Sequence, residues 1–234
     1  MEGARQGREA CLRTDVQQNP AALLATLHHL LDTRGSRPIQ VLFPYSHRLR
    51  LLVDWNVQLV AESLGKRTAG GECVGPTPHG AVGATDQHSQ VQLFAEGPDD
   101  KAFTFLRVLQ HADDIAIPEP PAGLEGLAYL GGKTFGQLLD AECRATQLAL
   151  TDAGRPNCTI TFPEVNATTV GEFLMWQMVS TAYGGQLYGI NAFDQPGVEA
   201  GKVATYGLMG RAGFEADRER VETARVSDPR FVVG

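Results

Sequence analysis

The sequence predicts a layered α/β fold with a mostly parallel sheet, and two observations support this. Short apolar runs rich in β-branched or aromatic residues alternate with longer segments whose apolar residues recur every three or four positions. Strands that alternate with helices in this way are typical of a parallel sheet covered by helices. With 234 residues, the chain is long enough for one large domain or two small ones.

In the first part of the chain, Asn19 and Pro20 predict a helix start, with Asn19 as the N-cap and Pro20 in the first turn. The leucines that follow keep helical spacing until Gly35. The apolar run 38–43 then predicts a buried strand. Residues 48–66 carry an apolar side at helical spacing and predict the next helix.

A glycine- and proline-rich loop over 68–83 is long enough to be functional or disordered. It is followed by a predicted helix that Thr85 or Asp86 caps and that runs to Glu96. The other predicted elements are helices over 1–10, 134–152, 168–183 and 195–209 and strands over 101–109 and 157–162. Three strands are few for so many apolar helices, so we expect a missed strand or an apolar surface left uncovered, to which the helix over 168–183 contributes.

Composition excludes several classes of protein. Twenty Lys and Arg against twenty-seven Asp and Glu give a net charge of −7, whereas a nucleic-acid partner usually needs a basic face. No apolar stretch approaches the roughly 20 residues that cross a bilayer, and the N-terminus has no hydrophobic signal-peptide core. No histidine spacing suggests a metal site. The four cysteines share no CxxC spacing and predict reduced thiols in a cytoplasmic protein: Cys11, Cys73, Cys143 and Cys158.

Gln58 and Glu62 are the first pair that can carry chemistry. They are four residues apart on a predicted helix and therefore share one face. Because apolar residues flank them, Glu62 can lie at the edge of a core and serve as a general base. A solvated surface glutamate explains the same spacing, and spacing alone favours that simpler interpretation.

His88 lies in the first turn of the helix predicted after the segment Gly83-Ala-Thr-Asp-Gln-His88. Backbone N–H groups at a helix N-terminus attract anions, and a histidine there can exchange protons near neutral pH. An N-cap followed by a surface histidine accounts for the pattern at least as well.

Residues 191–202 form the third candidate segment. Asp194 is expected to cap a helix with Pro196 in its first turn. Gln195 then lies at the helix entrance, and Lys202 follows roughly two turns later. Spacing alone indicates only a capped helix with a solvated lysine.

Three segments in a fixed order carry longer signatures: Ala61-Glu-Ser-Leu-Gly-Lys66, Gly83-Ala-Thr-Asp-Gln-His-Ser-Gln-Val-Gln-Leu93 and Gly189-Ile-Asn-Ala-Phe-Asp-Gln-Pro-Gly-Val-Glu-Ala-Gly-Lys202. They resemble, in that order, the (A/M)ES-x-GK, G-(A/T)-x-x-QH-x-x-x-QL and FDQ-x-GVE-x-x-K segments of the phosphoglucose isomerase (glucose-6-phosphate isomerase) family. The match is to the C-terminal half of bacterial forms and extends to the ending Asp228-Pro-Arg-Phe-Val-Val.

The resemblance implies a single three-layer α/β/α sugar-isomerase domain over residues 1–234, with 200–234 as a C-terminal helical tail. It also implies aldose–ketose isomerisation between glucose 6-phosphate and fructose 6-phosphate through a cis-enediol, with no metal or organic cofactor. Each candidate residue matches a family role: Glu62 the catalytic base, Gln58 a substrate contact, His88 and Lys202 ring opening, and Gln195 a contact near the phosphate. In the family the matching histidine comes from a neighbouring subunit.

The sequence departs from the family by lacking the N-terminal half. It has no GGR segment, whose arginine stabilises the enediolate in the family, because Gly70-Gly71 is followed by Glu72. We therefore expect the C-terminal half of an isomerase that works as a homodimer or with a complementing N-terminal half. A non-catalytic sugar-phosphate-binding domain is the alternative, whereas a nucleotide-binding domain is disfavoured by the lack of a GxGxxG or P-loop after a strand.

Overall fold

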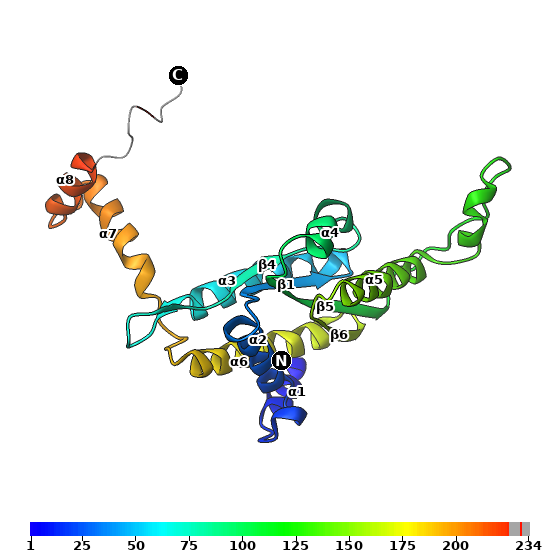
Figure 1. Ribbon diagram of the computed structural model, residues 1–234, viewed down its shortest axis with the longest axis horizontal. Helices are drawn as coiled ribbons and strands as arrows, with labels where there is room; N and C mark the ends of the chain where they lie inside the picture. Colours follow the sequence, from blue (N-terminus) through cyan, green and yellow to red (C-terminus); the bar gives the residue numbers. More distant parts are fainter. Residues whose placement is uncertain (225–229, 231–234) are drawn as a thin grey trace. The chain divides into compact units, whose positions relative to one another are not determined.

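Four parallel strands in the order β4-β1-β5-β6 form the sheet of the protein (Figure 1). The computed structural model describes residues 1–224 and residue 230. Its contacts divide the chain into two units, Met1–Ala192 and Phe193–Gly234, and the sheet belongs to the first. The strands are β1 (Ile39–Pro44), β4 (Thr77–Gly80), β5 (Lys101–Gln110) and β6 (Asn157–Glu164). The predicted α/β fold with a mostly parallel sheet is thus confirmed.

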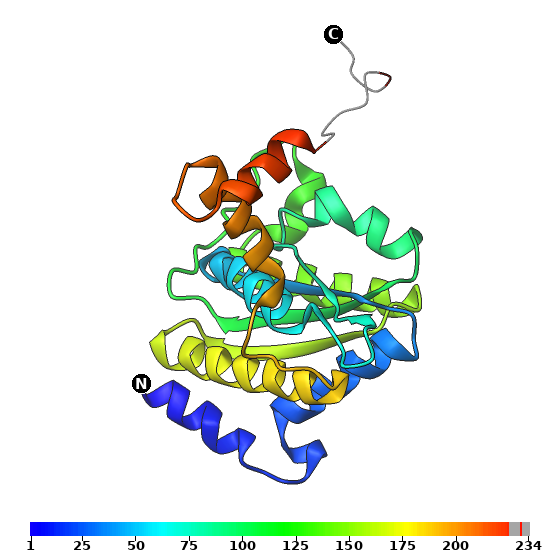
Figure 2. The same ribbon diagram turned by 90° about the vertical axis from the view of Figure 1, so that its left-hand side faces the viewer.

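Helices cover both faces of this sheet (Figure 2). Successive side chains of a strand point to opposite faces, and both faces are apolar here. On one face, α4 (Gln87–Glu96) and α5 (Phe135–Asp152) pack on β1 and β5 through a cluster that includes Phe43, Phe94, Phe105 and Cys143. On the other face, α3 (Arg50–Leu64) and α6 (Ala167–Tyr188) pack through a cluster that includes Leu42, Leu52, Leu106 and Phe173.

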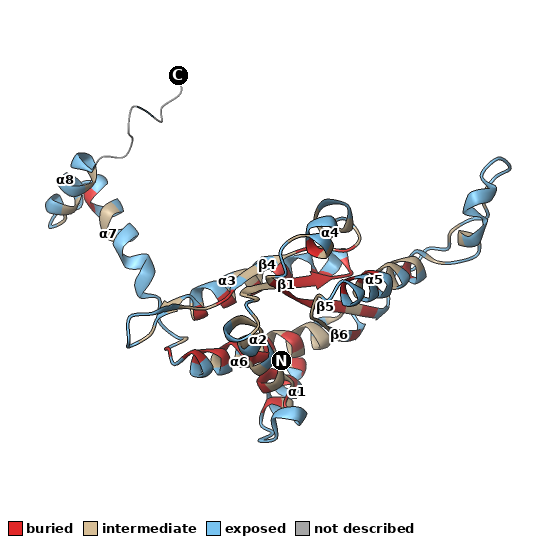
Figure 3. Ribbon diagram, in the orientation of Figure 1, coloured by how far each residue is buried: buried red, intermediate tan, exposed pale blue. Residues whose placement is uncertain are grey.

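The helix α6 is buried where it faces its neighbours, but Met178 and Tyr183 are exposed, so residues 168–183 contribute to exposed apolar surface as expected. The helix contacts α3 and also α1 (Glu2–Cys11) and α2 (Pro20–Thr33), so its buried residues lie among these three helices (Figure 3). Exposed apolar surface also lies along α2, where Leu27 and Leu30 help line a groove of about 460 Å³. The predicted cap of α2 is confirmed, because the backbone N–H of Ala22 donates to the side chain of Asn19 at 3.0 Å.

The strand β4 lies within the segment predicted as loop. Its sequence Thr-Pro-His-Gly lacks the β-branched run that indicates a strand. Pro78 is tolerated because β4 is an edge strand, paired with β1 on one side only. Before it, β2 (Lys66–Arg67) and β3 (Cys73–Val74) pair as a short antiparallel hairpin.

An arm of residues 111–134 extends between β5 and α5 (Figure 1). It contains the 3₁₀ helix η3 (Glu125–Leu130) and is closed by a bridge between Ala116 and Thr134. The irregular link predicted around Pro118-Glu-Pro-Pro121 lies in this arm. Thr134 then caps α5 with Gln137 in a reciprocal capping box.

The second unit contains η4 (Pro196–Val198), α7 (Glu199–Leu208) and α8 (Glu215–Thr223). The predicted helix over 195–209 therefore begins later, at Glu199, because a 3₁₀ turn over Pro196 and Gly197 precedes it. Arg211 stacks over the ring of Tyr206, with its guanidinium carbon 4.5 Å from the ring centroid. The ending Asp228-Pro-Arg-Phe-Val-Val lies, apart from Arg230, outside the described residues, and the single domain with a tail over 200–234 stays a prediction.

Candidate functional site

The helix α3 carries Gln58 and Glu62 on its exposed face, one turn apart. The Gln58 amide donates to the Glu62 carboxylate, with 3.5 Å between Nε2 and Oε1. Both side chains are exposed, which agrees with the solvated surface glutamate that spacing alone favours and not with a place at the edge of a core. The pair offers a carboxylate and an amide on one accessible surface, as general-base chemistry on a polar ligand requires.

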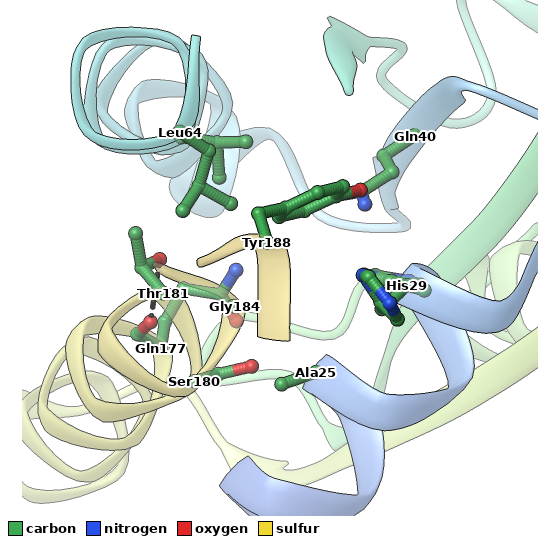
Figure 4. Close-up of a pocket in the computed structure, with 11 residues that line it drawn as sticks. Ala25, His29, Gln40, Leu64, Gln177, Ser180, Thr181, Gly184 and Tyr188 are labelled. Carbon is green, nitrogen blue, oxygen red and sulfur yellow. Dashed lines mark hydrogen bonds between the residues drawn. The ribbon is translucent and has the colours of Figure 1, made fainter. Parts of the chain in front are cut away.

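The opposite face of α3 is fixed by packing on α6. In the interior, Gln177 of α6 donates to Asn56 of α3 at 2.8 Å, and Leu64 lies against Gly184 (Figure 4). The cavity between these helices and α2 measures about 20 Å³, which is room for about one water molecule. A sugar phosphate does not fit there, so a substrate must approach α3 from its exposed side.

His88 lies in the first turn of α4, as predicted, and its side chain is exposed. The turn before it continues the sheet ladder, because the N–H of Gly83 donates to the Pro44 carbonyl at 3.0 Å. A Cβ on Gly83 would lie 2.6 Å from the ring of Tyr45, so only glycine allows this approach. The turn therefore holds His88 at the carboxyl edge of the strands, where open α/β sheets bind their ligands.

Asp86 takes the N-cap position of α4, as predicted, and its side chain stabilises the turn before the helix. Its carboxylate accepts the N–H of Val82 at 2.7 Å and the hydroxyl of Ser89 at 2.7 Å, and it makes no cap hydrogen bond to α4. Burial raises the pKa of this carboxyl, but the hydrogen bonds from Ser89 and Val82 outweigh burial and lower the pKa below 3.8. Folding thus favours the charged form of Asp86.

We expect Asp86→Ala to lower the free energy of unfolding by about 1–3 kcal/mol at pH 7, because the N–H of Val82 loses its acceptor. The folded pKa is lowered, so the stabilisation is complete above the pKa of the unfolded chain and is lost as the pH falls through the folded value. Chemical denaturation at pH 7 and at pH values below about 4 measures the difference. Thr85→Ala, at the exposed neighbour, is the control, and a pH-independent difference would exclude a role for the Asp86 charge.

Within one chain, Glu62 and His88 lie at opposite ends of the strands: Glu62 near the amino ends and His88 near the carboxyl ends. The helix α3 runs against the strand direction, since Val53 near its start lies against Gly80 at the end of β4, and Leu64 at its end lies against Gly75, before β4. Nine residues of helix separate Val53 from Glu62, or about 14 Å along the axis. His88 instead lies after the carboxyl ends of the strands, on the face of the sheet opposite to α3. The chain therefore does not bring the Glu62 and His88 side chains together.

Gln195 and Lys202 belong to the second unit. Gln195 takes the N-cap position of η4, and Lys202 is the fourth residue of α7 rather than two turns into a helix. The Lys202 ammonium forms an exposed ion pair with Glu199 at 2.8 Å. Asp194 is not a cap residue, because Gln195 precedes η4 and Val198 precedes α7.

Residues 1–192 thus form an α/β unit with a parallel sheet covered by helices, with Glu62 exposed on α3 and His88 exposed on α4. The sequence profile of the family described as "Phosphoglucose isomerase" matches residues 1–212. The chain belongs to the phosphoglucose isomerase family.

The names of the curated relatives agree with this family. Glucose-6-phosphate isomerases of Carboxydothermus hydrogenoformans and Rubrobacter xylanophilus are 47% and 50% identical to the chain, over 100% and 85% of it. They are matched over only 50% and 45% of their own lengths, so the chain spans about half of these relatives.

A hypothetical protein of Thermus thermophilus superimposes with a TM-score of 0.84 at 43% identity, covering 89% of this chain and 49% of that one. The glucose-6-phosphate isomerase of Chlamydia trachomatis has a TM-score of 0.78 at 23% identity and covers 94% of this chain and 44% of that one. At 23% identity, the similarity to the Chlamydia trachomatis protein shows only that the two chains share a fold.

Two further observations concern residues 1–224 and 230. No group of three or more His, Cys, Asp or Glu side chains among them is arranged to hold a metal ion. None of their helices is both long and apolar enough to span a membrane.

Proposed function

We propose that the chain contributes the proton-transfer residues of a glucose-6-phosphate isomerase. The observation that carries the proposal is the Gln58–Glu62 pair on the exposed face of α3, within a segment that resembles the family's (A/M)ES-x-GK signature. The fixed rear face of α3 supports it, because a general base must be held in position to act. The substrate is a sugar phosphate, and the enzyme works in the cytoplasm, as four free cysteines suggest.

Glu62 acts on the open-chain sugar. Its carboxylate removes the proton from C2, and the electron pair of that C–H bond forms the C1–C2 double bond while the C1 carbonyl becomes an enediol oxygen. The proton of the C2 hydroxyl then passes to the former C1 carbonyl oxygen, the C2–O bond becomes a carbonyl, and the electron pair of the C1–C2 double bond takes the first proton back from Glu62 at C1. Electrons and atoms balance without an oxidant or reductant, and the same steps run in reverse for fructose 6-phosphate. Gln58 orients the carboxylate or a substrate hydroxyl through its amide.

His88 and Lys202 open the sugar ring before this step, and Gln195 binds near the phosphate. Within one chain, Glu62 and His88 lie at opposite ends of the strands. A site that uses both residues therefore needs a second copy of the chain. A homodimer in which each copy gives His88 to the other's Glu62 meets this requirement. It also agrees with the origin of the matching histidine in the family.

The enediolate-stabilising arginine and the phosphate loop of the family have no counterpart in this sequence, which lacks a GGR segment. We propose that a polypeptide corresponding to the N-terminal half of the family supplies them. Removing a single preorganised donor from an oxyanion site already costs about 10²–10³-fold in rate. Turnover by the 234 residues alone is therefore expected to be at least that much slower than turnover by the complemented enzyme, which is the chain combined with such a half.

A coupled assay of fructose 6-phosphate conversion tests this proposal on the chain, on an N-terminal half from a 40–50% identical relative, and on their mixture. We expect activity on mixing and little from either part. Full activity of the chain alone would contradict the proposed need for a second half. Sugar-phosphate binding by the mixture without turnover would favour the non-catalytic alternative.

A further inference from the structure

Lys66, the last residue of the Ala61–Lys66 segment, contacts the helix that carries Glu62. Its ammonium donates to the backbone carbonyl of Glu62 at 2.6 Å and to that of Ser63 at 2.8 Å. We propose that Lys66 is a positioning residue for Glu62, which fixes the last turn of α3 by capping its carbonyl groups. This proposal rests on the proposed function in one respect only, namely that Glu62 is the base.

The last four carbonyls of a helix have no partner within it. In α3 the Ala61 carbonyl accepts the N–H of Gly65 at 3.1 Å, and the next two accept Lys66. The ammonium also lies at the negative end of the helix dipole, where a cation is favourable. Lys66 therefore holds both the carbonyl of Glu62 itself and the carbonyl that follows it.

Lys66 is itself held by the hairpin that follows α3. It pairs with Val74 across β2 and β3, and the hairpin returns to α3 at Gly75. Gly75 has a φ of +112°, which favours glycine, and a Cβ on it would lie 2.2 Å from the Leu64 carbonyl oxygen. The hairpin and the ammonium thus close the end of α3 together.

This arrangement explains the spacing of the signature. A lysine four residues after Glu62 returns its ammonium to the carbonyls of the final turn once Gly65 has ended the helix. The Glu62 carboxylate is exposed and accepts the amide of Gln58 from one turn earlier on the same helix, so its direction follows the backbone of the end of α3. Misplacing a reacting group by about 1 Å can cost as much as 10²-fold in rate.

Backbone hydrogen exchange of the 234-residue chain tests the cap without reference to activity. We expect Lys66→Met to speed exchange of the Gly65 amide about three- to tenfold, because two charge-assisted hydrogen bonds are lost. Arg67→Met is the matched control, since Arg67 lies in the same strand but its side chain donates to Gly71 of the hairpin, at 3.1 Å. Equal exchange of the Gly65 amide in the two variants would show that Lys66 does not stabilise the end of α3.

The complemented enzyme tests the effect on Glu62. Lys66→Met is expected to lower kcat per binding site about tenfold with KM within about twofold, where sites are counted by titration with a non-isomerisable sugar phosphate. Lys66→Arg keeps a cation at the carbonyls and is expected to restore kcat to within about threefold. An unchanged kcat per site, with fewer sites, would reduce Lys66 to a purely structural role. If the wild-type complemented enzyme does not isomerise sugar phosphates, the proposed function is wrong. The hydrogen-exchange result still shows whether Lys66 caps the end of α3.

Discussion

Glu62→Gln in the complemented enzyme is expected to lower exchange of the C2 proton with solvent by about 10²–10⁴-fold. The amide keeps the size of the side chain and its place beside Gln58 on the exposed face of α3, but it cannot accept and return a proton. Sugar-phosphate affinity should stay within about threefold, since the substitution removes a group used in the transition state. Deuterium incorporation at C2, followed by NMR, measures the exchange.

Glu72→Gln is the matched control for this substitution. Glu72 is also exposed and belongs to the same unit, but it lies in the hairpin loop after α3, where its N–H binds the Thr68 hydroxyl at 3.2 Å. We expect its exchange rate to equal that of the wild type. Wild-type exchange in the Glu62 variant would remove this carboxylate from the role of base.

His88→Ala is expected to slow turnover of cyclic glucose 6-phosphate by about 10²-fold or more, because a positioned acid–base group is lost. Turnover of an open-chain analogue that needs no ring opening should fall much less, since Glu62 performs the later step. Steady-state assays with both substrates measure the ratio.

Gln92→Ala, one turn further along the exposed side of α4, serves as the control for His88. Its side-chain amide donates to the carboxylate of Glu96 on the same helix at 2.8 Å, so both substrates should be turned over as in the wild type. Equal losses on both substrates in His88→Ala would place His88 outside the ring-opening step.

Helices and strands with a clear apolar pattern could be predicted from the sequence. Elements that contain proline or glycine where such residues are usually avoided could not. The strands β1 and β5 have largely apolar runs because helices cover both their faces, and β6 has the β-branched run Thr159 to Thr161. The edge strand β4 contains Pro78 and only four residues, so it has no such run. The helix α6 continues past Tyr183 through Gly184, a poor helix former that is retained where Leu64 approaches closely.

The candidate site shows the same division. Spacing correctly placed Gln58 and Glu62 on one helix face and His88 in a first turn, because both are properties of a single helix. It could not show that Glu62 and His88 lie at opposite ends of the strands, since that depends on which way α3 runs against β4. The contact of Lys66 with the end of α3 was missed for a similar reason, because it requires the helix to stop at Gly65.

Mixing two inactive variants measures most directly whether Glu62 and His88 of different copies act at one site. Glu62→Gln and His88→Ala chains, each complemented, are combined in equal amounts under conditions that exchange subunits. In a two-fold dimer with shared sites, half of the dimers are mixed and each mixed dimer has one intact site, so about a quarter of the wild-type activity should return. Activity that stays at the level of the separate variants, although mixed dimers have formed, would show that both residues act within a single copy or that one of them does not act at all.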